Sequence, residues 1–262
     1  MTLYAVGDIH GFSAQLDRAL GLIEADGGPD AQIYFLGDYA DRGPDSRGVF
    51  DRLIAGRDEG RPWRFCKGNH DRMFQRFLEA GEENDSRILS GKSWFHDALG
   101  GSRTLGSYGL DGEAQGFLMN GGVDTLASYH VDGESLSKAE LARAARAAIP
   151  DAHHDFLKGL PLYHETDDLI FVHAGLRPGV PLDEQDEDDL LWIREGWLES
   201  EADHGRLVIH GHTALDFPEH RGNRVNIDGG AGFGNPLVPV AIEGQSIYTL
   251  DERGRIPLEP RP

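Results

Sequence analysis

Short apolar runs alternate with amphipathic stretches through the first third of the chain. The runs have the length and the β-branched and aromatic content of buried strands, and they lie at residues 3–6, 32–36 and 63–66. In the stretches between and after them, apolar residues recur every three or four positions, which predicts helices at residues 13–25, 46–57 and 71–79. This β-α-β-α-β order is typical of a mostly parallel sheet in an α/β protein.

The regular pattern is lost after residue 80. Residues 81–136 are rich in Gly, Ser and polar residues, and we predict that they form an insertion or lid within a single domain covering residues 1–262. The sequence GGSRTLGSYGLDGE at 100–113 returns as GGVDTLASYHVDGE at 121–134, an offset of 21 residues. The simpler interpretation is a local duplication of a helix and turn, and the alternative is a pair of units that contact the substrate.

The second half of the chain returns to regular patterns. Helices are predicted at residues 137–149 and 152–159, and short strands at 169–172, 207–209, 225–227, 237–242 and 246–250. Short strands separated by turn signals favour a second sheet packed on the first. The acidic run at 183–189 is most simply a solvated loop.

Charge and cysteine content narrow the possible partners. The 262 residues include 25 Lys and Arg against 45 Asp and Glu, a formal net charge of −20. Nucleic acids and anionic lipids bind chiefly through Lys and Arg, so we expect neither as a partner. Cys66 is the single cysteine, which excludes an intrachain disulfide and a thiolate metal cluster. The chain opens directly on a strand and contains no run of 18 apolar residues, so we expect a soluble, cytoplasmic protein.

Polar residues of metal-ligand type follow five of the apolar runs. The five blocks are GDIHG at 7–11, GDYADRG at 37–43, GNHD at 68–71, VHAG at 172–175 and GHT at 211–213. In open α/β sheets, ligands bind at the carboxyl ends of the strands, so these five ends can converge on one crevice. Alone, a histidine such as His173 is more often a hydrogen-bonded structural residue, but five blocks in this order favour a metal site.

In this order, the five blocks resemble those of the calcineurin-like metallophosphoesterases. GDYADRG with GNHD is most similar to the phosphoprotein phosphatase branch, which includes bacterial Ser/Thr phosphatases. The resemblance implies a two-sheet β-sandwich flanked by helices, with two divalent metal ions bound. It also implies that Asp38 bridges the ions, that Asp8 and His10 hold the first, and that Asn69, His173 and His212 hold the second. Such mixed carboxylate, amide and imidazole ligands suit manganese, which we prefer, or iron or zinc.

The same resemblance implies roles for residues that handle protons and phosphate. His70 resembles the general acid that protonates the leaving group, and Asp41 resembles the carboxylate that orients it. Arg42 and Arg194 resemble the arginines that clamp phosphoryl oxygens. For Arg194, a salt bridge to the preceding acidic run is the alternative. His210 is interpreted as a structural residue or as one that supports a metal ligand from outside the coordination sphere.

Two departures from family patterns bear on the substrate. Ala214 stands where many diesterases carry a second histidine, and Asp41 stands where symmetrical dinucleoside tetraphosphatases typically carry alanine. The leading hypothesis is therefore a phosphomonoesterase that hydrolyses phosphoserine and phosphothreonine in proteins by direct attack of metal-bound hydroxide.

Two other functions are considered. The first is a symmetrical dinucleoside tetraphosphatase or another hydrolase of small phosphate esters, in which lid aromatics stack a base: Trp94, Phe95, Tyr108 and Tyr129. The second is a catalytically silent module that binds phosphoproteins. The sequence leaves the oligomeric state open.

Overall fold

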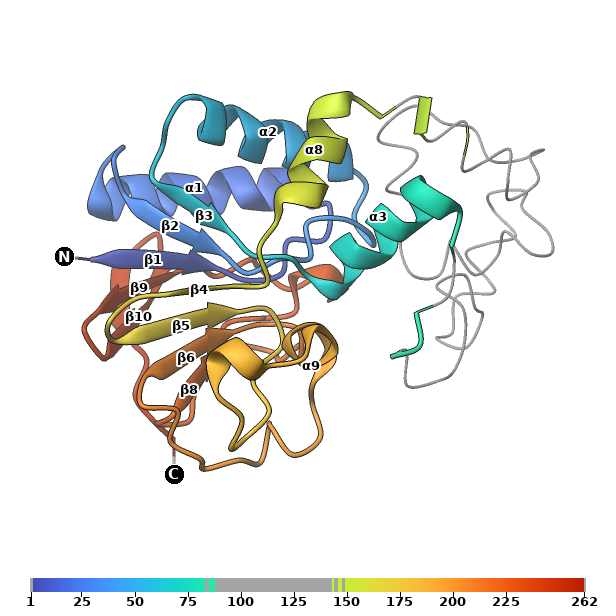
Figure 1. The fold of residues 1–262 in the computed structure, drawn as a ribbon. Coiled ribbons are helices and arrows are strands. Elements are labelled where there is room, and N and C mark those ends of the chain that lie inside the picture. Colours follow the sequence, from blue (N-terminus) through green and yellow to red (C-terminus); the bar gives the residue numbers. More distant parts are fainter. Residues whose placement is uncertain (1, 83–84, 88–142, 144–145, 148, 262) are drawn as a thin grey trace.

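Two β-sheets packed face to face form the centre of the computed structural model, which describes residues 2–82, 85–87, 143, 146–147 and 149–261. Helices lie on the outer face of one sheet, and a shorter helical segment lies beside the other (Figure 1). This arrangement confirms the predicted α/β fold of two sheets flanked by helices.

The first sheet has six strands in the order β11-β10-β9-β1-β2-β3. Their bounds are β1 (Leu3–Val6), β2 (Gln32–Phe35), β3 (Trp63–Phe65), β9 (Val240–Glu243), β10 (Ser246–Asp251) and β11 (Gly254–Pro257). β1, β2 and β3 run parallel, as predicted, and β9 pairs with β1 in the antiparallel sense. The last two predicted strands therefore belong to this sheet, not to the second one.

The second sheet has five strands in the order β4-β5-β6-β8-β7. Their bounds are β4 (Tyr163–Glu165), β5 (Leu169–Val172), β6 (Leu207–His210), β7 (Glu219–His220) and β8 (Arg224–Asn226). β5, β6 and β8 run parallel, and the short strands β4 and β7 add antiparallel edges. The edge strands were not predicted from the sequence, because they are short and only partly apolar.

The helices lie outside the two sheets. They are α1 (Ser13–Gly27), α2 (Ser46–Asp58), α3 (Asn69–Ala80), α8 (Asp151–Gly159) and the short α9 (Glu187–Trp192). α1, α2 and α8 cover the outer face of the six-stranded sheet, and α3 starts at the end of β3 (Figure 1). The predicted helices at 13–25, 46–57, 71–79 and 152–159 agree with these elements to within two residues at each end.

Alternation along the strands explains how the layers are joined. In β5, Leu169 and Phe171 pack between the two sheets, while Ile170 and Val172 pack on the outer face near α9. Both faces of such a strand are buried, so its sequence is continuously apolar. The ring of Phe171 stacks on Tyr34 of β2 with centroids 3.7 Å apart, which connects the sheets directly.

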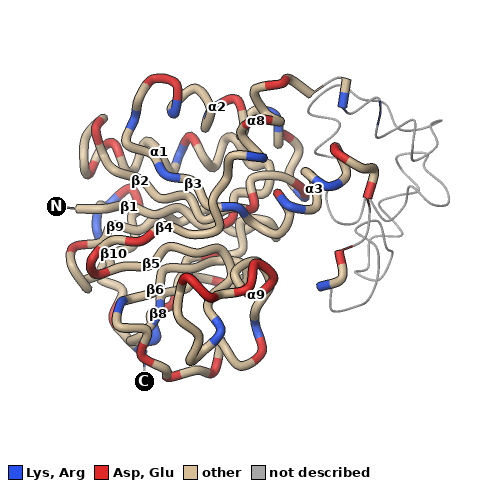
Figure 2. The backbone as a smooth tube through the Cα atoms, in the orientation of Figure 1, with Lys and Arg blue, Asp and Glu red and all other residues tan. Residues whose placement is uncertain are grey.

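The acidic run at 183–189 is not simply a solvated loop. It contains a 3₁₀ turn and the start of α9, and Asp189 is buried. Acidic residues gather along this segment in Figure 2. Asp188 accepts a hydrogen bond from Arg72 of α3 at 2.7 Å, and Asp189 accepts two from Arg177 at 2.6 Å each. The run thus pairs its charges with Arg72, 116 residues away, and with Arg177, 12 residues away, and periodicity reveals neither pair.

Most of the predicted insertion at 81–136, its repeated segments and most of the predicted helix at 137–149 lie outside the described residues. Among the residues that the structure describes, none of the helices is long and apolar enough to cross a membrane.

Candidate active site

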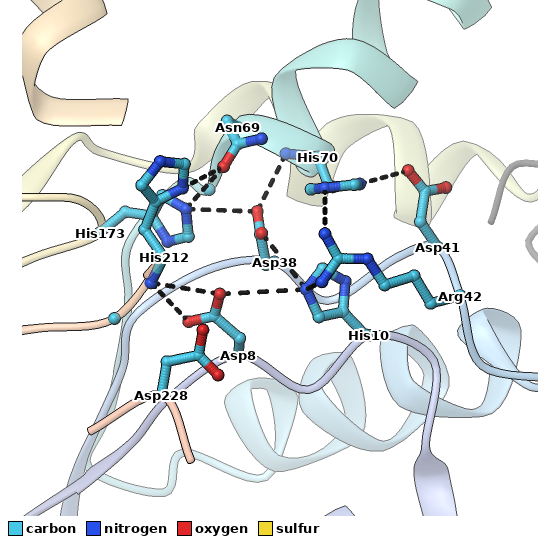
Figure 3. Close-up of polar contacts among 12 residues, drawn as sticks. Asp8, His10, Asp38, Asp41, Arg42, Asn69, His70, His173, His212 and Asp228 are labelled. Carbon is cyan, nitrogen blue, oxygen red and sulfur yellow. Dashed lines mark hydrogen bonds and ion pairs between the residues drawn. The ribbon is translucent and has the colours of Figure 1, made fainter. Parts of the chain in front are cut away.

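Residues from both sheets meet at one edge of the sandwich, where the parallel strands end (Figure 3). Each predicted metal ligand comes from a segment that follows one of these strands: Asp8 and His10 (β1), Asp38 (β2), Asn69 (β3), His173 (β5) and His212 (β6). All six side chains are buried. The packing of two sheets thus gathers donors that are as far as 204 residues apart.

Backbone strain is concentrated at this edge. Among the described residues, those with positive φ that are not glycine are His10, Asp38, Asp41, Arg42 and His212, with φ between 49° and 72°. Each such residue costs about 1–2 kcal/mol relative to ordinary backbone. All five residues lie at the site, as strained residues often do where the backbone must orient side chains for binding or catalysis.

Asp38 occupies the centre of the cluster. Its Oδ2 lies 3.5 Å from His10 Nε2, and its Oδ1 lies 3.5 Å from His173 Nε2. Asp8 Oδ2 lies 3.9 Å from the same His10 nitrogen. The two oxygens of Asp38 therefore face donors on opposite sides, as a carboxylate that bridges two ions would.

The second group of donors converges on Asn69. Its Oδ1 lies 2.9 Å from His173 Nε2 and 2.8 Å from His212 Nδ1. The other ring nitrogen of His212, Nε2, is buried without a hydrogen-bond partner among the described residues. A buried nitrogen without a partner is costly unless a ligand takes it, so this donor set fits a divalent cation.

Hydrogen bonds to the backbone orient two of the imidazoles. Nδ1 of His10 lies 3.0 Å from the carbonyl oxygen of Ala40, and Nδ1 of His173 lies 2.9 Å from that of Leu36. When Nδ1 donates to a carbonyl, Nε2 carries the lone pair that a metal needs. Burial also lowers the pKa of His173 to about 3, which keeps the ring in the neutral, ligating form.

The carboxylates at the centre require compensation by positive charge. Burial raises the pKa of Asp8 and Asp38 well above the usual range, and the neighbouring Asp228 and Asp71 raise them further. Clustered buried carboxylates are stable as anions only beside cations. Two dications, held by the six residues above, would supply that charge.

His70, Asp41 and Arg42 form a hydrogen-bonded cluster beside the predicted metal ligands. Nδ1 of His70 lies 2.7 Å from Asp41 Oδ2, and Arg42 Nη2 lies 3.2 Å from His70 Nε2. Burial and the charge of Arg42 lower the pKa of His70, so the ring is neutral, donating to Asp41 through Nδ1 and accepting from Arg42 at Nε2. Arg42 Nη1 also donates to His10 Nε2 at 2.8 Å, so Arg42 must leave this nitrogen for His10 to act as a ligand.

Arg194 also lies at this site and does not pair with the acidic run at 183–189 among the described residues. Its Nη2 donates to the carbonyl oxygen of His212 at 3.5 Å. Burial lowers the pKa of Arg194, and the charges of Asp38, Asp8 and Asp228 oppose this shift. The alternative, a salt bridge to the preceding acidic run, is not seen among the described residues, because the run pairs with Arg72, Arg87 and Arg177.

The remaining histidine of the β6 segment, His210, ends the strand, and among the described residues its ring contacts Gly211 and Trp197 and neither Asn69 nor Asp38. His210 is buried against Trp197, with ring centroids 5.3 Å apart, and burial lowers its pKa to about 3.

Two buried carboxylates were not assigned a role from the sequence. Asp71, in the GNHD block, accepts hydrogen bonds from the backbone N–H groups of Asp38, Tyr39 and Gly68, at 2.8 to 3.0 Å, and so holds the loop that carries Asp38. Asp228 follows β8 next to Asp8 (Figure 3) and accepts from the N–H of Gly230 at 2.9 Å. The sequence carried a signal for Asp228, since IDGG follows an apolar strand as the other five blocks do.

Glycines allow the ligands to sit against the backbone. A Cβ at position 68 would lie 2.1 Å from Asp38 Oδ1, and a Cβ at position 211 would lie 2.2 Å from Asp8 Oδ1. Any side chain at either position would push a carboxylate out of place.

Comparison with known proteins agrees with this geometry. The family model described as calcineurin-like phosphoesterase matches residues 1–216. A symmetrical bis(5'-nucleosyl)-tetraphosphatase of Acidovorax sp. (strain JS42) is 45% identical over 71 residues, which are 27% of this chain and only 24% of the relative's length. The asymmetrical bis(5'-nucleosyl)-tetraphosphatase PrpE of Anoxybacillus flavithermus is 25% identical over 260 residues, covering 88% of this chain and 86% of that protein.

Solved structures share the fold. A putative diadenosine tetraphosphatase superimposes with a TM-score of 0.57 at 20% identity, covering 98% of this chain and 94% of the other. A Ser/Thr phosphatase of Saccharomyces cerevisiae gives 0.52 at 15% identity, covering 98% and 78%. With the family match over most of its length, this chain belongs to the calcineurin-like phosphoesterases.

Proposed function

We propose that this protein is a phosphomonoesterase dependent on two divalent metal ions. Asp8 and His10 would hold the first ion, Asn69, His173 and His212 would hold the second, and Asp38 would contribute to both. We favour manganese, with iron or zinc as alternatives, because the ligands are oxygen and imidazole donors. When bound, such ions would lower the pKa of a water molecule and polarise the phosphoryl group.

The protein's own side chains would bind the phosphoryl group and supply the proton for the leaving group. Arg42 and Arg194 would hold the phosphoryl oxygens, and both lie against the ligand cluster, Arg42 through His10 and Arg194 through the backbone of His212. Once Arg42 has turned from His70 to the phosphate, Nε2 of His70 would take up a proton, with Asp41 stabilising the protonated ring through Nδ1, and would then pass this proton to the oxygen of the leaving group.

The contact of 2.7 Å between Asp41 and His70 carries the proposal. An alkoxide such as that of serine or threonine is a poor leaving group unless it is protonated, whereas a phosphate leaving group has little need of an acid. A buried acid with its own carboxylate partner therefore favours phosphoserine and phosphothreonine in proteins as substrates.

Dinucleoside tetraphosphates are the second candidate substrate. They are favoured by the names of the relatives, which include symmetrical and asymmetrical bis(5'-nucleosyl)-tetraphosphatases. The lid aromatics first considered for base stacking, from Trp94 to Tyr129, lie outside the described residues.

Replacing His70 by Asn tests the proposal. The manganese-loaded H70N variant should lose about 10²- to 10⁴-fold in kcat on a phosphoserine peptide, the usual contribution of general acid catalysis. It should retain its metal content and most of its turnover of diadenosine tetraphosphate. Unchanged turnover of the peptide would remove His70 from this role.

The matched control is H153N. His153 is also buried and lies 2.9 Å from a carboxylate, Asp51, but it sits on α8. H153N should keep the activity of the parent on every substrate. In the parent enzyme, a strong preference for diadenosine tetraphosphate over the peptide would instead select the second candidate.

A further inference from the structure

Phe233 is an exposed aromatic side chain at the rim of the candidate site. Its exposed fraction is 69%, the highest of the three large hydrophobic residues that are exposed in the described part of the chain. It ends a short 3₁₀ helix, Ala231–Phe233, which follows β8 and the buried Asp228. A single exposed aromatic side chain is ordinary on a protein surface, so the position of Phe233 beside the charged residues of the site is the observation that bears on ligand binding.

The ring of Phe233 lies on Arg42. The guanidinium carbon of Arg42 is 4.5 Å from the ring centroid, a cation–π contact. Arg42 in turn donates to His10 and His70, at 2.8 and 3.2 Å. One side of the ring therefore borders the residue that we expect to bind phosphate, and most of the ring surface remains open to solvent.

The backbone holds this ring in place. A Cβ at position 232 would lie 2.5 Å from His10 Cδ2 and 2.9 Å from Arg42 Nη1, so the turn is packed directly on the site. Asp228 accepts a hydrogen bond from the N–H of Gly230, and the N–H of Phe233 donates to the carbonyl of Gly230, each at 2.9 Å. The position of Phe233 is thus set by a buried carboxylate and by close packing.

We propose that Phe233 is a stacking platform that gives the site additional affinity for phosphate esters carrying a planar aromatic group close to the phosphate, either a nucleobase or an aryl ring, beyond the alkyl phosphates of the proposed function. The proposal rests on the phosphate-binding role of the site. Arg42 would hold the phosphate, and the exposed ring beside it would stack on the aromatic group of the same molecule. Stacking on an aromatic side chain strengthens the binding of a base by about 5- to 150-fold, and for one exposed ring we expect a preference in the lower part of this range, about tenfold.

Ligand pairs that differ only in the aromatic group test this platform without requiring turnover. Calorimetry on the manganese-loaded protein would compare AMP with ribose 5-phosphate, each as its non-hydrolysable methylenephosphonate analogue, and phenylphosphonate with methylphosphonate. We expect the aromatic member of at least one pair to bind about tenfold more tightly, and we expect Phe233→Leu to reduce that ratio to about twofold or less. A preference in the first pair alone identifies a nucleobase, and one in the second pair alone identifies an aryl ring.

Two further variants control for indirect effects. Phe233→Trp should keep the preference, because it retains a planar ring. Phe217→Leu should also keep it, since Phe217 is likewise exposed (47%) but its ring is not found over Arg42 in the described structure.

The platform is refuted if the parent protein shows no preference in either pair. It is also refuted if Phe233→Leu weakens ribose 5-phosphate and AMP equally, because Phe233 would then only position Arg42. Failure of the proposed function looks different: turnover of phosphoserine peptide would be absent or insensitive to H70N, while the ratio of AMP to ribose 5-phosphate affinity would still respond to Phe233→Leu.

Discussion

Replacing Asp41 by Asn separates the role of its charge from the role of its shape. Asp41 is fully buried and lies in the left-handed region with φ of 72°, which asparagine tolerates as well as aspartate does. Its backbone N–H donates to Ser46 Oγ at 3.2 Å, and its carbonyl accepts from Gly43 at 2.8 Å. D41N keeps both of these hydrogen bonds, so we expect the fold to be retained.

The size of the expected loss in kcat follows from the contact between Asp41 and His70. The carboxylate stabilises the protonated imidazole through a hydrogen bond of 2.7 Å, and the amide oxygen of asparagine accepts that bond without the charge. A hydrogen bond to a charged group is worth about 1.5–3 kcal/mol, so kcat on an alkyl phosphate should fall about 10- to 150-fold. p-Nitrophenyl phosphate has a leaving group that needs no proton, so its turnover should fall less than about threefold.

The assay is a comparison of kcat for the parent and D41N on a phosphoserine peptide and on p-nitrophenyl phosphate, with metal content measured in both proteins. Because each substrate is compared with itself, its intrinsic reactivity cancels from the result. Equal losses on the two substrates, with metal content unchanged, would refute a role for Asp41 in protonating the leaving group. A loss of metal would show instead that Asp41 supports the ligand cluster.

Other changes test the metal centre and the ion pairs around it. Burial raises the pKa of Asp8 and Asp38 above the unfolded values, so the metal-free protein loses stability as pH rises through the folded values. Manganese competes with protons for these oxygens, so in a thermal shift assay it should raise Tm by about 5–10 °C at pH 8, at 100 times the Kd measured at that pH, and by less at pH 5.5 at the same manganese concentration. An equal rise in Tm at both pH values would argue against binding at these carboxylates. Gly68→Ala would place a methyl group 2.1 Å from Asp38 Oδ1, so metal content measured by mass spectrometry should fall below two ions per chain; full occupancy would show that the loop can shift. Arg72→Met removes the pair with the buried Asp85 at 2.9 Å and leaves Arg76 at 3.3 Å, so it should cost about 1–3 kcal/mol in denaturant unfolding. Exposed Arg18→Met, which removes the pair with Glu252, should cost under about 1 kcal/mol. Similar losses for the two variants would mean that burial adds nothing to the Arg72 pair.

Local sequence determined the strands of the core and the blocks that follow them. An apolar run ending in glycine and a polar residue is a signal carried by neighbours in the chain, so β1, β2, β3, β5 and β6 were predicted together with the polar residues at their ends. The family resemblance then supplied the roles of those residues, and the structure brings all six predicted ligands, His70, Asp41 and both arginines to one edge of the sandwich.

Tertiary structure alone decided the features that depend on partners distant in the sequence. β9 joins the first sheet because it pairs with β1, and an isolated strand does not specify which edge it will join. Asp189 is buried because Arg177 and Arg87 neutralise it, which a run of acidic residues does not indicate. The exposure of Phe233 above Arg42 likewise depends on how a turn packs against residues almost 200 positions away. Pairing and charge compensation are non-local, and for that reason the sequence predicted the side chains of the site but not the contacts that hold them.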